Sequence, residues 1–82
     1  MIVLGQIVFS KCGRDKGLAM VVLKIEGEYL YLADGKTRTL QRPKKKKAKH
    51  VQHTHYIVEL TTSCGRDLQD ADIRKKIKHH VS

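Results

Sequence analysis

Short β-prone segments, separated by turns that contain glycine, recur about every ten residues through the first half of the chain. Residues 3–9 and 28–33 alternate between apolar and polar positions, and residues 18–25 form a valine-rich apolar run. These patterns predict three strands, which at this spacing favour a small barrel or sandwich. We expect the core to contain Ile7, Phe9, Val21, Leu23, Leu30 and Leu32.

The middle of the chain changes from apolar to basic. Asp34-Gly35 is the strongest hairpin signal in the sequence, so a fourth strand is predicted over 37–41, ended by Pro43. Residues 42–49 then read as an extended basic loop. Residues 50–60 are β-prone again and are predicted to close the barrel as a fifth strand.

The last twenty residues predict a loop followed by a helix. Gln69 or Asp70 is the expected cap, and the carboxylates of Asp70 and Asp72 favour the positive end of the helix dipole. An apolar stripe with helical spacing should dock on the barrel or face a protein partner; it consists of Ile73, Ile77 and Val81.

A chain of 82 residues has room for one small domain. We therefore expect residues 1–82 to form one unit, with a β-meander over 1–43, a basic loop and closing strand over 44–60, and a loop and helix over 61–82. No apolar stretch approaches the ~18 residues that span a bilayer. The first residues do not resemble a signal peptide, so a cytoplasmic protein without membrane contact is expected.

The two cysteines lie in a repeated tetrapeptide. Cys12-Gly13-Arg14-Asp15 recurs at residues 64–67, but four residues are too few for a structural repeat, and both copies have the composition of a turn. Two cysteines do not form a disulfide framework, and neither has a recognisable catalytic context. With no phosphate-binding glycine loop either, we expect no enzyme activity.

Positive charge is concentrated in one block. The chain has 17 basic and 8 acidic residues, and eight of the basic ones lie between Asp34 and Glu59 without an acidic residue among them. The remainder of the chain is nearly neutral. A local block of this kind predicts a polyanionic partner, nucleic acid before membrane, although a solvated loop would look the same.

The turn over residues 11–17 also suits a phosphate backbone. Gly13 permits close approach of a ligand, Gly17 can adopt a positive φ, and Asp15 is expected to orient Arg14, which can form paired bonds to phosphate. Tyr29 and Tyr31 could stack on bases or pack at the core edge. The expected RNA contacts are Lys11, Arg14, Lys16, Arg38, Arg42, Lys44, Lys45, Lys46, Lys47, Lys49 and His50.

His53 and His55 are the best candidates for metal ligands, because residues two apart share one face of a strand. Their basic surroundings repel cations, however. We therefore expect no metal and no cofactor.

Several of these segments resemble a KOW motif: residues 5–8, the turn over 13–17, the apolar residues 20–22 and Asp34-Gly35. The whole chain resembles a short, bacterial-type relative of the family of eukaryotic and archaeal large-subunit ribosomal protein fourteen. That family continues into a basic segment that ends near a His-hydrophobic pair, here His50-Val51, and has a helix of the type seen at residues 70–75.

The resemblance implies an SH3-like barrel and RNA binding. The histidine-rich stretch from His50 to His55 lies outside the family pattern. We therefore expect a monomeric RNA-binding protein, either a ribosomal subunit or a ribosome-associated factor. KOW domains also imply a different possibility, a protein-interaction module of the transcription or translation machinery.

Overall fold

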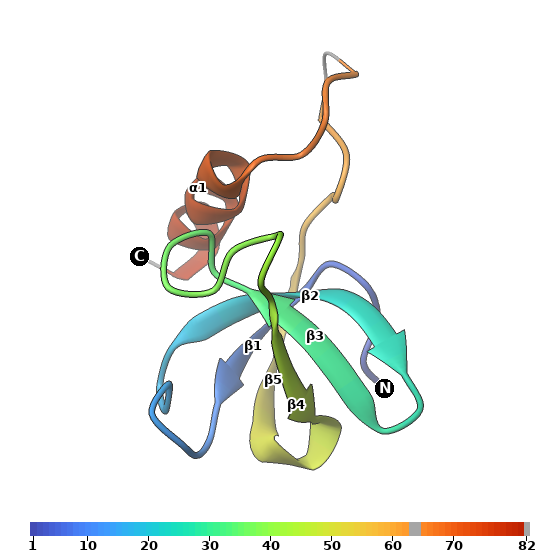
Figure 1. Ribbon diagram of the computed structural model, residues 1–82, viewed down its shortest axis with the longest axis vertical. Coiled ribbons are helices and arrows are strands. Elements are labelled where there is room, and N and C mark those ends of the chain that lie inside the picture. Colours follow the sequence, from blue (N-terminus) through green and yellow to red (C-terminus); the bar gives the residue numbers. More distant parts are fainter. Residues whose placement is uncertain (63–64, 82) are drawn as a thin grey trace.

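Five strands and one C-terminal helix make up a computed structural model that describes residues 1–62 and 65–81 (Figure 1). The mainly β fold with a C-terminal helix is therefore confirmed. The strands are antiparallel neighbours in the order β4-β3-β2-β1-β5. In chain order the elements are β1 (Gln6–Ser10), β2 (Ala19–Glu26), β3 (Tyr29–Ala33), β4 (Lys44–Lys47), the short 3-10 helix η1 (Ala48–His50), β5 (Val51–Ile57) and α1 (Asp70–Val81).

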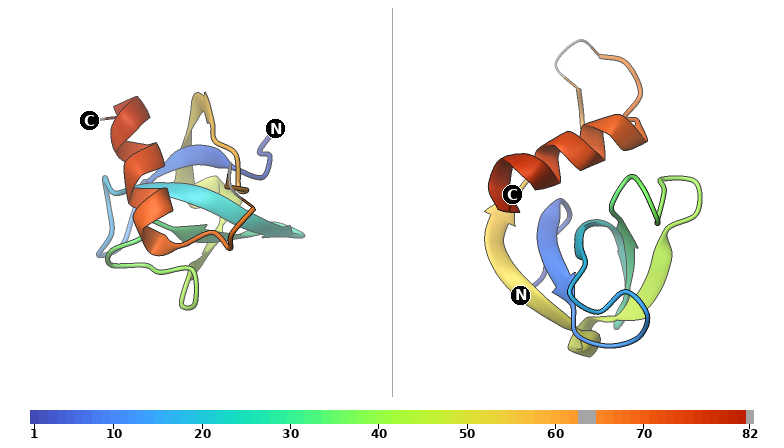
Figure 2. Two further views of the ribbon diagram at one scale, coloured as in Figure 1. Left: turned by 90° about the horizontal axis from the view of Figure 1, so that it is seen from above. Right: turned by 90° about the vertical axis from the view of Figure 1, so that its left-hand side faces the viewer.

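The sheet curls strongly but stays open. Figure 2 shows the strands bent into a half-barrel, with α1 lying across one side of it. β4 and β5 form the two edges of the sheet. The prediction that residues 50–60 close the barrel is thus wrong: the strand forms, but it pairs with β1 at an edge. The architecture is compatible with a small, open SH3-like barrel.

β1 and the first half of β2 are buried on both faces, because α1 covers the outside of this part of the sheet. The barrel interior contains Val8, Met20, Val22, Leu30, Leu32 and Val51. Ile7 and Val21 are paired across β1 and β2 and point the other way, toward α1. The predicted core therefore mixed two faces, and Phe9 and Leu23, which were expected inside, are half-buried.

The helix forms where the charge pattern predicts it. The backbone N–H of Gln69 donates to Asp72 Oδ2 at 2.9 Å, so a carboxylate in the first turn satisfies a free donor before the helix. The apolar stripe docks on the sheet as expected: Ile73 is fully buried, and Ile77 and Val81 pack against the same cluster.

The structure corrects the prediction for residues 34–47. Residues 34–43 form an irregular loop in place of a hairpin and fourth strand, because the Asp34 carboxylate accepts hydrogen bonds from the N–H groups of Lys36 (3.0 Å) and Arg38 (2.7 Å). The lysines predicted to lie in a basic loop instead form β4, paired with β3. An edge strand tolerates such a run, since lysine is a common protection against edge-to-edge pairing.

Candidate nucleic-acid interface

One lysine of the basic run is buried and belongs to the fold. Lys46 is 8% exposed, and its Nζ lies 3.1 Å from Asp15 Oδ1 and 2.8 Å from the carbonyl oxygen of Cys12. Ser10 Oγ lies 3.0 Å from the same carboxylate oxygen. The expectation that Asp15 orients Arg14 is therefore wrong. Asp15 instead fastens the 11–17 turn to β4.

The positive charge of Lys46 favours the ionised form of Asp15. Burial tends to raise the pKa of Asp15, but hydrogen bonds from Lys46 and Ser10, together with the positive charge of Lys46, outweigh it and lower the pKa below its usual value. Asp15 is therefore ionised at neutral pH and neutralises Lys46. Consequently Lys46 is removed from the set of predicted RNA contacts.

The 11–17 turn presents its remaining cations to solvent. Gly17 has φ +85°, which confirms the predicted left-handed conformation, and Gly13 has φ +84°. The N–H of Lys11 donates to the carbonyl oxygen of His50 at 2.9 Å and so joins the turn to η1. The side chains on this turn that are exposed and basic are Lys11, Arg14 and Lys16.

The outward side chains of β4 lie over the tyrosines of β3. Lys45 Nζ is 4.7 Å from the ring centre of Tyr29 and 5.9 Å from that of Tyr31, within cation–π range. Lys47 Nζ is 5.8 Å from the Tyr29 ring and 3.5 Å from Glu28 Oε1. The tyrosines are half-buried on the outer face, and their ring faces already have cationic neighbours. Part of the lysine charge on this face is therefore used within the protein.

The irregular loop over 34–43 is held by the helix. Asp70 Oδ1 accepts a hydrogen bond from the N–H of Leu40 at 2.8 Å, and the Arg74 guanidinium donates to the carbonyl oxygen of Gly35. This loop carries Arg38, which is half-buried, and Arg42, which is exposed. Arg38 lines one cavity together with residues of the 11–17 turn, so two predicted basic segments meet there.

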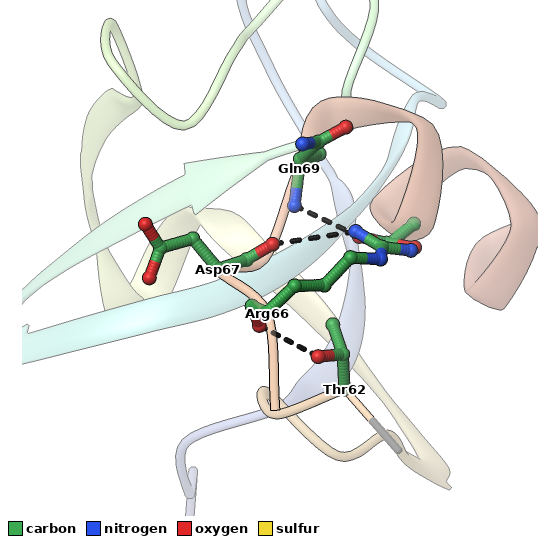
Figure 3. Close-up of polar contacts among 5 residues, drawn as sticks. Thr62, Arg66, Asp67 and Gln69 are labelled. Carbon is green, nitrogen blue, oxygen red and sulfur yellow. Dashed lines mark hydrogen bonds and ion pairs between the residues drawn. The ribbon is translucent and has the colours of Figure 1, made fainter. Parts of the chain in front are cut away.

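The second copy of the repeated tetrapeptide has a different role. The Arg66 guanidinium bonds both carboxylate oxygens of Asp72, at 2.7 and 2.9 Å, and Figure 3 shows its further contacts in the loop before α1. This pairing lowers the pKa of Asp72 to about 2. Gly13 and Gly65 both have positive φ, as expected of shared turn chemistry. Cys64 lies outside the described residues.

Sequence reasoning missed two ion pairs, the Lys46–Asp15 pair at the interface and the Arg66–Asp72 pair between the preceding loop and the first turn of α1. No local signal identifies Lys46 rather than its neighbours as the partner of Asp15, because the choice depends on the alternation of β4 and its register with β3. Arg66 and Asp72 are six residues apart. The acidic start predicted for the helix includes Asp72, but the sequence does not indicate the partner of its carboxylate.

Within residues 1–62 and 65–81, no group of three histidine, cysteine or acidic side chains is placed to hold a metal ion. His53 and His55 are exposed on β5. None of the helical structure described here is long and apolar enough to cross a membrane. No protein-family model matches the sequence, and no curated protein matches it either.

Proposed function

We propose that this protein binds RNA through the basic surface around the 11–17 turn, the 34–43 loop and the β4–η1 segment. The observation that carries the proposal is the Lys46–Asp15 pair, since it fastens the basic turn to the basic strand. The cations that remain available around this junction are Lys11, Arg14, Lys16, Arg38, Arg42, Lys44 and Lys49, beside the half-buried side chain of His50.

Such a surface suits a phosphate backbone. Exposed cations displace counterions from the nucleic acid, which gives affinity without a sequence requirement. Arg14, on the turn, and Arg38, on the adjacent loop, can also form paired bonds to phosphate oxygens. Because the turn is fixed by a buried ion pair, its cations are already in place before RNA arrives, which lowers the ordering cost of binding.

Ribosomal RNA is the proposed target, on the strength of the resemblance of the turn and the helix to the ribosomal family. Co-sedimentation with ribosomes at increasing salt tests this part. We expect association at low salt that is lost progressively as salt rises. Association that persists at high salt would favour a protein partner.

The rival function, a protein-interaction module, is implied by the KOW resemblance, and its contact face would be the apolar stripe of α1. Ile73 is fully buried against the sheet, and Ile77 and Val81 pack beside it, so the stripe is already occupied. This leaves the basic surface as the better supported site.

The direct test is binding of the full chain to a fluorescent single-stranded RNA. Arg42→Gln/Lys44→Gln removes two charges from the proposed surface, and Lys75→Gln/Lys78→Gln removes two from α1 as a matched control. We expect the first variant to bind about tenfold more weakly, with a salt slope smaller by about 1.4, and the control to change little. Equal losses in both variants, or no binding by the unaltered protein, would contradict the proposal.

A further inference from the structure

We propose that the cavity between the 11–17 turn and the 34–43 loop binds one unpaired nucleotide of the RNA, with the phosphate held by Arg14, Lys16 and Arg38. This inference rests on the proposed function and deepens it. Both segments lie on the left side of the molecule in Figure 1. The cavity measures about 580 Å³, and Leu18 and Thr37 also line it.

The charge of the cavity wall is strongly positive. Three of the lining residues are cations, and the one acidic residue, Asp15, is neutralised by Lys46 at 3.1 Å. An anionic group that enters the cavity therefore meets uncompensated positive charge. Arginine is well suited to a phosphate because its planar group offers several donors in a fixed arrangement.

Two of the residues that line the cavity each carry a buried polar atom without a hydrogen-bond partner. Among the residues that the structure describes, two buried side-chain polar atoms have no hydrogen-bond partner, and these are Asp15 Oδ2 and Arg38 Nε. Both residues line this cavity. Buried polar atoms nearly always have a partner, so one unused acceptor on the turn side and one unused donor on the loop side favour a ligand that offers both a donor and an acceptor. A nucleotide does, because its phosphate accepts hydrogen bonds and its base and ribose donate them.

The two walls are fixed independently of any ligand. On one side, Lys46 holds Asp15 and the carbonyl of Cys12. On the other, Asp34 accepts hydrogen bonds from two backbone N–H groups of the loop, and α1 holds the same loop through Asp70 and Arg74. A cavity with such walls loses little conformational freedom on binding.

The size of the cavity selects the ligand. About 580 Å³ lies within the ~300–1,000 Å³ typical of small-molecule sites, so it accommodates a nucleotide but not a duplex. The apolar side chain of Leu18 offers surface to a base or ribose, beside the cations that suit the phosphate. An unpaired nucleotide, free of stacking on its neighbours, is the form of RNA that can enter.

Two pairs of single-charge variants of the full chain test the site. Arg38→Gln is compared with Lys36→Gln in the same loop, and Arg14→Gln with Lys11→Gln in the same turn. Each pair removes equal charge, but only the arginines line the cavity. Affinity is measured by fluorescence anisotropy with a single-stranded RNA of about twelve nucleotides. We expect each arginine variant to lose about tenfold more affinity than its lysine control, as for the loss of a charged hydrogen bond.

Backbone NMR gives a second readout. Adding the RNA should shift the amide signals of Leu18, Thr37 and Arg38, and adenosine 5′-monophosphate should shift the same signals at much higher concentration. Equal losses within each pair, or shifts elsewhere, while the unaltered protein still binds RNA, would overturn the nucleotide site and leave the proposed function standing. Mononucleotide or inorganic phosphate that binds as tightly as the RNA would overturn RNA as the ligand. Failure of the unaltered protein to bind RNA would overturn both proposals.

Discussion

Lys46 Nζ lies 3.1 Å from Asp15 Oδ1, although the two residues are 31 positions apart, and both side chains are more than nine-tenths buried. The pair joins the first hairpin turn to the edge strand β4. It takes one cation out of the basic run and fixes the position of the others. The most basic segment of the chain thus serves the fold and the proposed interface at once.

Loss of Lys46 should destabilise the protein far more than loss of its neighbour. Lys46→Ala leaves Asp15 buried without its partner, which costs about 3–5 kcal/mol of unfolding free energy. Lys45→Ala removes only an exposed side chain with its cation–π contacts to Tyr29 and Tyr31, and should cost no more than about 1 kcal/mol. Urea denaturation measures both. The double variant Asp15→Leu/Lys46→Met should recover most of the stability, because no charge is left unpaired. Equal effects of the two alanine variants would show that the pair is not buried in solution.

The same pair predicts a change in the sign of the pH dependence. In the unaltered protein the pKa of Asp15 is lowered. Its ionised carboxylate therefore stabilises the folded state at pH values above 3.8, and this stabilisation is lost as pH falls through the pKa that Asp15 has in the folded protein. In Lys46→Met, burial is no longer offset by a cation, and the pKa of Asp15 should be raised above that value. Its contribution to stability should then increase as pH falls. Urea denaturation across this pH range, with Lys45→Met as control, should show that the stability deficit of Lys46→Met relative to the control shrinks as pH falls; a deficit that does not change with pH would contradict this prediction.

Two glycines with similar backbone angles should respond differently to alanine. Gly17 (φ +85°) has no atom within 4 Å of an added Cβ, so Gly17→Ala should cost about 1–2 kcal/mol from the backbone angle alone. At Gly35 (φ +79°) the Cβ would lie 2.3 Å from the carbonyl oxygen of Asp70. Gly35→Ala must separate the 34–43 loop from α1 and should cost more. Thermal unfolding compares the stability lost in the two variants. Equal losses would mean that the loop does not contact the helix.

Docking of α1 is tested at its one fully buried side chain. Ile73→Ala should lower the unfolding free energy by about 2–5 kcal/mol, as for other large-to-small core changes. Ile25→Ala, at a 39% exposed position, should cost much less. If Ile73→Ala costs as little as Ile25→Ala, the helix is not held by the sheet, and its apolar stripe would be available to a protein partner.

The parts of the fold that follow local patterns could be predicted from the sequence. Alternation over 28–33 located β3, and the acidic start of residues 70–72 located α1. The strand at residues 44–47 could not be predicted, because four lysines carry no hydrophobic alternation and become a strand only by pairing with β3. Likewise Asp34-Gly35 has the composition of a hairpin turn, but the Asp34 side chain closes a loop instead.

The sequence could predict which residues belong to the candidate site, but not how those residues are arranged in space. The charge count identified Arg14, Lys16 and Arg38, yet nothing local shows that the 11–17 turn and the 34–43 loop border one cavity. Nor does the sequence show that Lys46 points into the protein while Lys45 points out. Both facts depend on long-range strand register, which a single sequence does not specify.

The central claim is that exposed cations around the Lys46–Asp15 pair bind an RNA backbone, and the salt dependence of binding tests it most directly. For about five phosphate contacts with single-stranded RNA, log K should fall linearly with log salt with a slope near −3.5. Binding should then weaken about 100-fold between ~50 and ~200 mM salt. An affinity for RNA that does not change over this range, or no binding at its lower end, would contradict the claim.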